Sequence, residues 1–211
     1  KRAVVESLRK SKAEQEKERV ERAKKRAEEQ AAAYKAGQHT KLAVKAPTRS
    51  APLRDILHRL EVKDKSLTDL DFSKGSWWLS GDDIDELTEA LEQNDVVASL
   101  NFHGNSLGVP GAEAVARCLR VNRSITSVNL GGNGITDTGL IKLADALQGS
   151  VDDESACVMH TLNVWSNSIT DRGLHRLIVA LKRNSTLRTL DLAGNSITCA
   201  GAKELAGILR E

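Results

Sequence analysis

From residue 67 onward, the chain repeats one pattern five times. Apolar residues stand at its first, fourth, sixth and eleventh places and Asn at its ninth, as in LRTLDLAGNSI from Leu187 to Ile197. A Gly follows fourteen residues after each start, and apolar residues at helical spacing come after that Gly. A unit of this length cannot bury its apolar face alone, so the pattern predicts stacked strand-and-helix units that share one core. The copies start at Leu67, Val97, Ile125, Met159 and Leu187, which lie 30, 28, 34 and 28 residues apart.

Each place of the pattern has a physical role. The apolar places send side chains inward from a short strand, the Asn amide can bond main-chain groups of neighbouring turns, and the Gly suits a tight approach into the helix. The pattern resembles leucine-rich repeats of the ribonuclease-inhibitor-like type over about residues 53–211. The resemblance implies an α/β fold, a curved leucine-rich-repeat solenoid with parallel strands inside and helices outside. An extended charged helix is expected at the N-terminal end.

Two copies depart from the pattern. The first has Gly75 at the Asn place, with Trp77 at an inward place and Trp78 left over. We expect Trp78 to pack on the preceding helix or on a partner. The fourth copy starts six residues late, after the acidic segment 149–156. That segment is interpreted as a tolerated surface insertion between a helix and the next strand.

Composition divides the chain into four parts. Residues 1–35 are rich in Lys, Arg, Glu and Ala without Gly or Pro, which predicts a charged helical arm. Residues 36–52 are a linker, and residues 53–66 have apolar residues at helical spacing that predict an N-terminal cap helix. Residues 67–211 are the five repeats. The last repeat ends inside its helix without a recognisable cap, so we expect further repeats or a partner to cover it.

Charge is distributed unevenly between these parts. Residues 1–66 contain 19 Lys and Arg against 10 Asp and Glu, a net charge of +9, whereas residues 67–211 contain 12 against 19, a net charge of −7. A basic arm on an acidic body suggests a charged partner for the arm. Contact with nucleic acid or a microtubule is therefore expected only through the arm, whose densest basic residues are Arg22, Lys24, Lys25 and Arg26.

Several function classes find no support in the sequence. There is no phosphate-binding loop with a following Lys and Ser or Thr, no HExxH and no GxSxG, so we predict that the chain is not an enzyme. Three cysteines without a CxxC pair argue against a disulfide framework or a zinc site and favour a reducing compartment. No apolar run is long enough to span a bilayer. We expect no cofactor, no metal, no small-molecule substrate and no membrane contact.

The side chains between the strand leucines form columns on the concave face. The first two columns are polar and carry no positive charge, so this face would repel a phosphate backbone. Trp165 stands in a third column among small or polar residues, where an exposed Trp is typical of binding hot spots. Alternatively, it leans over Gly131 and Ala193 and only fills a groove. The residues expected to contact a partner on this face are Asp69, Asp71, Asn101, Asn129, Asn163, His103 and Trp165.

We therefore predict a non-catalytic scaffold subunit that binds other proteins of a larger, multi-subunit intracellular assembly through the repeats and the basic arm. Short arrays with charged helical extensions are similar to proteins of the ciliary axoneme and other cytoskeletal complexes. That similarity implies a cytoplasmic location, in the cytoskeleton or a cilium.

Three alternatives remain open. Some arrays of this type act as GTPase-activating proteins for the nuclear-transport GTPase, although no residue here can be matched to that activity. A subunit of an RNA–protein complex, docked by the basic arm, is the second. The third is an innate-immune or inhibitor module, which normally follows a nucleotide-binding domain that these residues do not contain.

Overall fold

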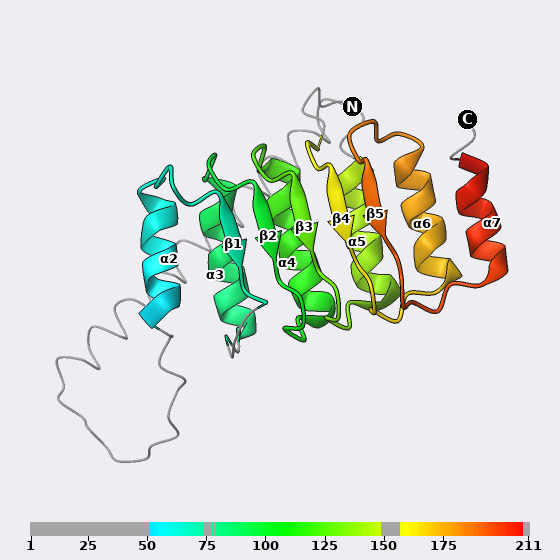
Figure 1. Ribbon diagram of the computed structural model, residues 1–211, viewed down its shortest axis with the longest axis horizontal. Coiled ribbons are helices and arrows are strands. Elements are labelled where there is room, and N and C mark those ends of the chain that lie inside the picture. Colours follow the sequence, from blue (N-terminus) through cyan, green and yellow to red (C-terminus); the bar gives the residue numbers. More distant parts are fainter. Residues whose placement is uncertain (1–50, 74–76, 78, 149–156, 209–211) are drawn as a thin grey trace, which may run out of the picture. The chain divides into compact units, whose positions relative to one another are not determined.

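The structure is a computed structural model that describes residues 51–73, 77, 79–148 and 157–208 (Figure 1). The predictions for the charged arm, for Trp78 and for the insertion at 149–156 fall outside the described residues, as does the linker up to residue 50. In chain order the elements are α2 (Ala51–Glu61), β1 (Asp69–Asp71), α3 (Gly81–Glu92), β2 (Ser99–Asn101), α4 (Gly108–Val121), β3 (Ser127–Asn129), α5 (Thr136–Gln148), β4 (Thr161–Asn163), α6 (Asp171–Leu181), β5 (Thr189–Asp191) and α7 (Cys199–Ile208).

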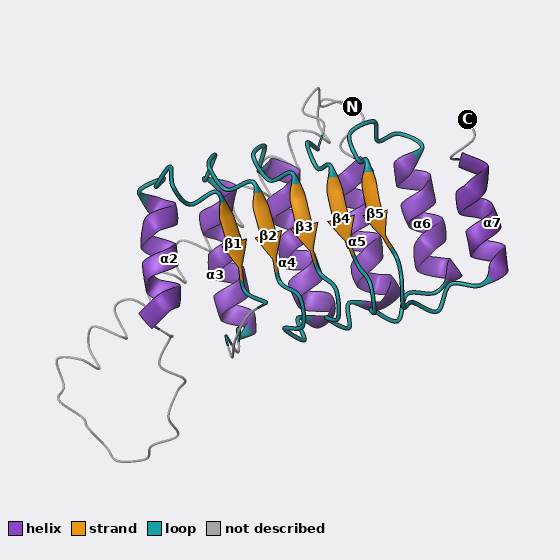
Figure 2. Ribbon diagram, in the orientation of Figure 1, coloured by secondary structure: helices purple, strands orange, loops and turns teal. Residues whose placement is uncertain are grey.

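The five strands form one parallel sheet in chain order, and the helices cover one of its faces (Figures 1 and 2). The predicted α/β fold, with parallel strands backed by helices, is therefore confirmed. Equivalent places of the repeats are in register across the sheet, as in the pairing of Leu100 with Val128 and of Val128 with Leu162. These fourth-place residues are at most 1% exposed, because the strand turns them toward the helices.

The helix before the first repeat differs in its bounds from the predicted cap over 53–66. It begins at Ala51, where Pro52 suits a first helical turn, and it ends at Glu61. Lys63 adopts a left-handed conformation with φ of 51°, and the N–H of Asp64 bonds the carbonyl oxygen of Arg59 at 2.9 Å. This is the Schellman ending, which stops a helix even without Gly.

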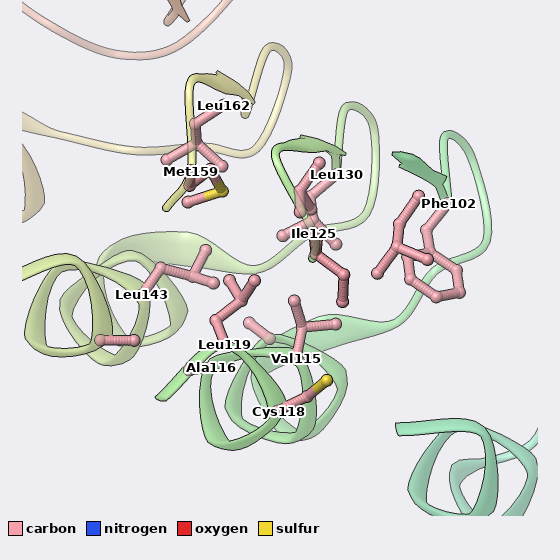
Figure 3. Close-up of a cluster of buried hydrophobic side chains, with 14 of the residues drawn as sticks. Phe102, Val115, Ala116, Cys118, Leu119, Ile125, Leu130, Leu143, Met159 and Leu162 are labelled. Carbon is pink, nitrogen blue, oxygen red and sulfur yellow. The ribbon is translucent and has the colours of Figure 1, made fainter. Parts of the chain in front are cut away.

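The core between sheet and helices is mainly aliphatic. Val115 and Leu119 of α4 pack toward Ile125 and Leu130 from the strand side (Figure 3). At the N-terminal end the core becomes aromatic. Phe72 stacks on Phe102 with ring centroids 5.2 Å apart, and Trp77 meets Phe72 edge-on at 5.1 Å, which confirms its inward place.

The ninth-place Asn residues form a ladder that links consecutive repeats. The side-chain oxygen of Asn167 accepts hydrogen bonds from the main-chain N–H of Asn133 at 3.0 Å and of Ile135 at 3.1 Å. Its amide donates to the carbonyl oxygens of Leu130 at 2.8 Å and Val164 at 3.0 Å. Asn167 is fully buried, so the ladder satisfies backbone groups that water does not reach, as the pattern predicts.

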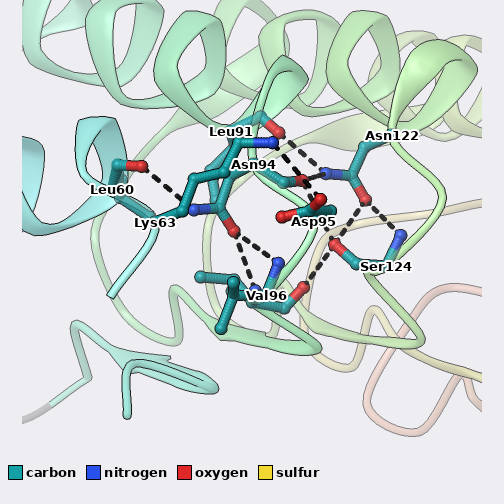
Figure 4. A network of polar contacts seen from close by, with 9 residues as sticks. Leu60, Lys63, Leu91, Asn94, Asp95, Val96, Asn122 and Ser124 are labelled. Carbon is teal, nitrogen blue, oxygen red and sulfur yellow. Dashed lines mark hydrogen bonds and ion pairs between the residues drawn. The ribbon is translucent and has the colours of Figure 1, made fainter. Parts of the chain in front are cut away.

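A second set of Asn side chains lies where the helices before the second, third and fifth repeats return to the next strand (Figure 4). The Asn94 amide donates to the carbonyl oxygen of Leu60 at 3.1 Å, and the Asn122 amide donates to the carbonyl oxygens of Leu91 at 2.7 Å and Asn94 at 2.8 Å. The Asn184 amide makes the same kind of bond. The repeat pattern as defined from the sequence did not include this place, which stands three residues before each start.

The Gly fourteen residues after each start has a different role from the expected one. None of these residues has a positive φ. A Cβ at Gly139 would instead lie 2.9 Å from the Cβ atoms of both Ala112 and Ile135, and one at Gly173 would lie 2.5 Å from the carboxylate of Asp137. At Gly139, Gly173 and Gly201, the helix approaches the preceding repeat too closely for a side chain. A Cβ at Gly81 would have nothing within 4 Å, so this close approach does not explain the Gly of the first copy.

The last repeat is less covered than the others. Leu187, Leu190, Leu192 and Ile197 are half-buried, whereas the equivalent residues of the fourth repeat are fully buried. Within the described residues, no helix is long and apolar enough to cross a membrane.

Candidate partner-binding surface

The face of the sheet opposite the helices carries the predicted columns. Asp69 pairs in register with Ser99, and Asp71 pairs with Asn101, so the sequence placed these side chains correctly. Asp69 and Asp71 are exposed, whereas the Asn residues of the second column are half-buried. The structure therefore brings together the residues predicted for this face, namely Asp69, Asp71, Asn101, Asn129, Asn163, His103 and Trp165.

The second column has a structural task that the sequence did not reveal. Each of its Asn or Asp side chains accepts a hydrogen bond from the main-chain N–H two residues later. The distances are 3.1 Å for Asn101, 2.9 Å for Asn129, 3.0 Å for Asn163 and 2.9 Å for both Asp71 and Asp191. Asn and Asp side chains commonly close turns in this way. One side-chain oxygen at each place therefore ends a strand and is not free to bind a partner.

Trp165 is the large aromatic residue on this face. Its side chain rests against Gly131 of the preceding repeat, where a Cβ would collide with Nε1 and Cδ1 of the indole. The ring also stacks on His103, with centroids 5.1 Å apart and planes inclined by 29°. Trp165 is still 36% exposed. Trp165 thus fills the space above Gly131 and also presents aromatic surface to the solvent, while its role in binding stays a prediction.

The main chain of the same glycine also holds the ring of His103. Its Nδ1 lies 2.9 Å from the carbonyl oxygen of Gly131. Gly131 thus serves both rings, because its missing side chain admits the indole and its carbonyl oxygen holds the imidazole. His103, Gly131 and Trp165 form one unit, which we call the aromatic platform. The sequence signal for it was the column of His, Gly and Trp at equivalent places of three consecutive repeats.

The helix-covered side of the array has a different character. There, ion pairs between exposed side chains link consecutive helices, and exposed pairs of this kind contribute little to stability. Their N–O distances are 2.6 Å for Asp85 with Arg117, 3.2 Å for Glu113 with Lys142 and 2.9 Å for Asp145 with Arg176. Between α6 and α7, Nδ1 of His175 makes a hydrogen bond with the carboxylate of Glu204 at 2.6 Å.

A cavity of about 200 Å³ lies between α3 and α4, away from the sheet face. Its walls include Leu79, Ile84, Leu107 and Pro110, and the Asp85–Arg117 pair borders it. In the part of the chain that the structure describes, no group of three or more His, Cys, Asp or Glu residues is placed to hold a metal ion.

Repeats in register, a Leu-lined core and Asn ladders define the chain as a leucine-rich repeat protein. A family profile described as a leucine-rich repeat matches residues 121–144 and 183–206. Each matched segment begins near the end of one helix and extends into the helix of the next repeat.

Two curated relatives and one solved structure show what the chain is similar to. It is 29% identical over 163 residues to human NACHT, LRR and PYD domains-containing protein 13, a match that covers 77% of this chain and 15% of the relative. It is 32% identical over 102 residues to human tropomodulin-4, a match that covers 48% of this chain and 29% of the relative. The structure of leiomodin-1 actin-binding site 2 has a TM-score of 0.60 and 25% identity, and the match covers 74% of this chain and 85% of that one. The chain spans less than a third of the length of these curated relatives.

Proposed function

We propose that this chain is a non-catalytic protein-binding module of a cytoskeletal assembly, and that its partner docks on the sheet face around Trp165. The observation that carries the proposal is the aromatic platform, in which Trp165 is held in place by Gly131 and His103 and yet remains 36% exposed. A Trp presented on a rigid scaffold is typical of binding hot spots. The parallel sheet supplies that scaffold.

Actin is the first partner to test. Support comes from the likeness to the structure of leiomodin-1 actin-binding site 2 and from the match to tropomodulin-4. The same proposal places the chain in a multi-subunit intracellular assembly. The cilium and the ribonuclease-inhibitor-like subclass stay predictions, and the subclass is supported by the 28-residue spacing with a true helix in each repeat.

Binding of the 211-residue chain to monomeric actin and to filaments tests the proposal, by pull-down and by co-sedimentation. We expect Trp165→Ala to weaken binding by roughly thirtyfold, about 2 kcal/mol, as for a hot-spot residue. Val121→Ala is the matched control, because Val121 is 53% exposed at the end of α4 and does not lie in the sheet columns. Unchanged binding by Trp165→Ala would show that the partner uses another surface.

Gly131→Ala tests whether binding depends on the position of the Trp165 indole, because this variant keeps the indole but moves it. Gly131 has no positive φ, so alanine is compatible with its backbone, but the new Cβ would displace Trp165. We expect this variant to bind as weakly as Trp165→Ala while keeping all three tryptophans. If neither form of actin binds the wild-type chain, actin is not the partner.

The basic arm is proposed as a second contact with an acidic filament surface. Its support is the net charge of +9 over residues 1–66. Deleting residues 1–50 should remove a strongly salt-sensitive part of the binding and leave a part with a weaker salt dependence. Equal salt dependence with and without these residues would exclude the arm from the interface.

A further inference from the structure

The hydrogen bond made by Nδ1 of His103 determines whether the other ring nitrogen, Nε2, donates or accepts a hydrogen bond. A carbonyl oxygen only accepts hydrogen bonds, so Nδ1 of His103 must carry the proton that lies between it and the oxygen of Gly131, 2.9 Å away. In the neutral imidazole, Nε2 is then an unprotonated acceptor. No hydrogen bond to Nε2 is formed by the residues that the structure describes. The platform therefore contains an acceptor without a hydrogen-bond partner among the described residues, on a ring that stacks on Trp165.

The three columns around the platform are acidic. Of their fifteen side chains, three are carboxylates, Asp69, Asp71 and Asp191, and none is Lys or Arg. Asp191 is on the strand next to Trp165, where it pairs with Asn163 and accepts a hydrogen bond from its amide at 3.1 Å. Strand geometry places it roughly 8 Å from the Trp165 backbone, which is about one Debye length at physiological salt.

Two cations adjoin these columns in sequence, Lys74 after Ser73 of the first repeat and Arg188 before β5, and Lys74 lies outside the described residues. Arg188 immediately precedes Thr189, the first residue of that strand, and it is five residues before Ala193, which occupies the column place of Trp165. At about 3.3 Å per residue, its backbone is roughly 16 Å away along the strand. The local charge that a ligand meets at the platform is therefore set by carboxylates.

The platform is also open on the side of the loops. The place that follows the third column is occupied by Gly104, Gly132, Ser166 and Gly194, with φ between 52° and 73°. No side chain larger than that of Ser rises from this row in the second to fifth repeats. A long, flat group can thus approach along the loops and lie on the two rings.

From these features we propose that the aromatic platform binds an arginine side chain of the partner protein. The planar guanidinium stacks on the indole of Trp165, donates a hydrogen bond to Nε2 of His103 and is attracted by Asp191. Arginine fits better than lysine because its flat cation can stack and donate at the same time. Anionic groups are disfavoured by the carboxylates. This inference rests on the proposed function, since it concerns the same face.

Titration of the 15N-labelled 211-residue chain with short capped peptides tests the proposal by NMR. The probes are Ac-Gly-Arg-Gly-NH2 and its Lys, citrulline and Glu counterparts. The Arg peptide should move the indole N–H signal of Trp165 and the ring signals of His103, with binding about threefold tighter than that of the Lys peptide. The citrulline and Glu peptides should leave those signals in place, and Trp165→Ala should abolish binding of the Arg peptide.

Arg188→Ala is the matched control and should bind the Arg peptide at least as well as the wild type. The proposal is overturned if the Arg peptide moves neither ring, if the Lys or citrulline peptide binds equally well, or if long-range 15N spectra show that Nδ1 of His103 is unprotonated. The two proposals fail separately. Actin binding lost in Trp165→Ala without any response to the Arg peptide refutes the arginine pocket alone, whereas a specific Arg response with unchanged actin binding refutes the proposed function alone.

Discussion

Replacing Asn167 by Ala tests how much the ninth-place ladder contributes to stability. The substitution removes the acceptor from two main-chain N–H groups, those of Asn133 and Ile135, and the donor to the carbonyl oxygen of Leu130. Asn167 is fully buried, so water does not readily replace these bonds. Each buried group left unsatisfied costs about 1–3 kcal/mol, and we expect the free energy of unfolding to fall by about 4 kcal/mol.

The matched control is Asn195→Ala, in the same ladder but in the less covered last repeat. Its side chain accepts from Asn167 and Ile169, yet Asn195 is only half-buried, so water can solvate the groups it leaves. A loss of about 1–2 kcal/mol is expected there. Urea denaturation followed by circular dichroism measures both losses. Equal losses for the two variants, or a loss below about 1 kcal/mol for Asn167→Ala, would refute the argument that burial sets the cost.

Three further predictions use the same chain. Gly139→Ala should destabilise the fold by about 1–3 kcal/mol in urea, because its Cβ meets two others at 2.9 Å, whereas Gly207→Ala, with nothing within 4 Å, should not. Hydrogen bonds from a main-chain N–H and a guanidinium lower the pKa of Asp64 from 3.8 to about 2, so the stability it contributes is complete above about pH 4 and lost toward pH 2. Asp64→Asn should flatten that part of the pH–stability curve. A thiol reagent at pH 8 should label exposed Cys199 but not Cys118, whose pKa burial raises to about 12, and equal labelling would contradict the packing.

Those parts of the fold that depend on periodicity could be predicted from the sequence. Five starts with apolar residues at fixed places determine which side chains face inward, and because each strand pairs in parallel with the next, equal places must fall in register. The same reasoning placed Trp165 and His103 in one column. It could not show that their rings stack, because stacking depends on side-chain rotamers and on the space above Gly131.

Residues with two compatible roles were the hardest to interpret. Asn129 on a solvent-facing column looks like a binding residue, yet its oxygen closes a turn by accepting from the N–H of Gly131. Asn122 stands at the end of a helix, outside the repeat pattern as defined from the sequence, yet its amide donates buried hydrogen bonds to the carbonyl oxygens of Leu91 and Asn94. In both cases, the deciding fact is the direction of an amide, which composition and spacing do not encode.

The hydrogen bonds within the array also limit which side chains are available for specific recognition by a partner. First-place, fourth-place and ninth-place side chains face the core or the ladder, and one oxygen of every second-column side chain closes a turn. The third column carries none of these tasks, so it can vary from Ser73 through His103 and Gly131 to Trp165 without disturbing the solenoid. Specificity should therefore be concentrated in that column. Substitutions there should change binding more than the free energy of unfolding, the reverse of what we expect for the Asn ladder.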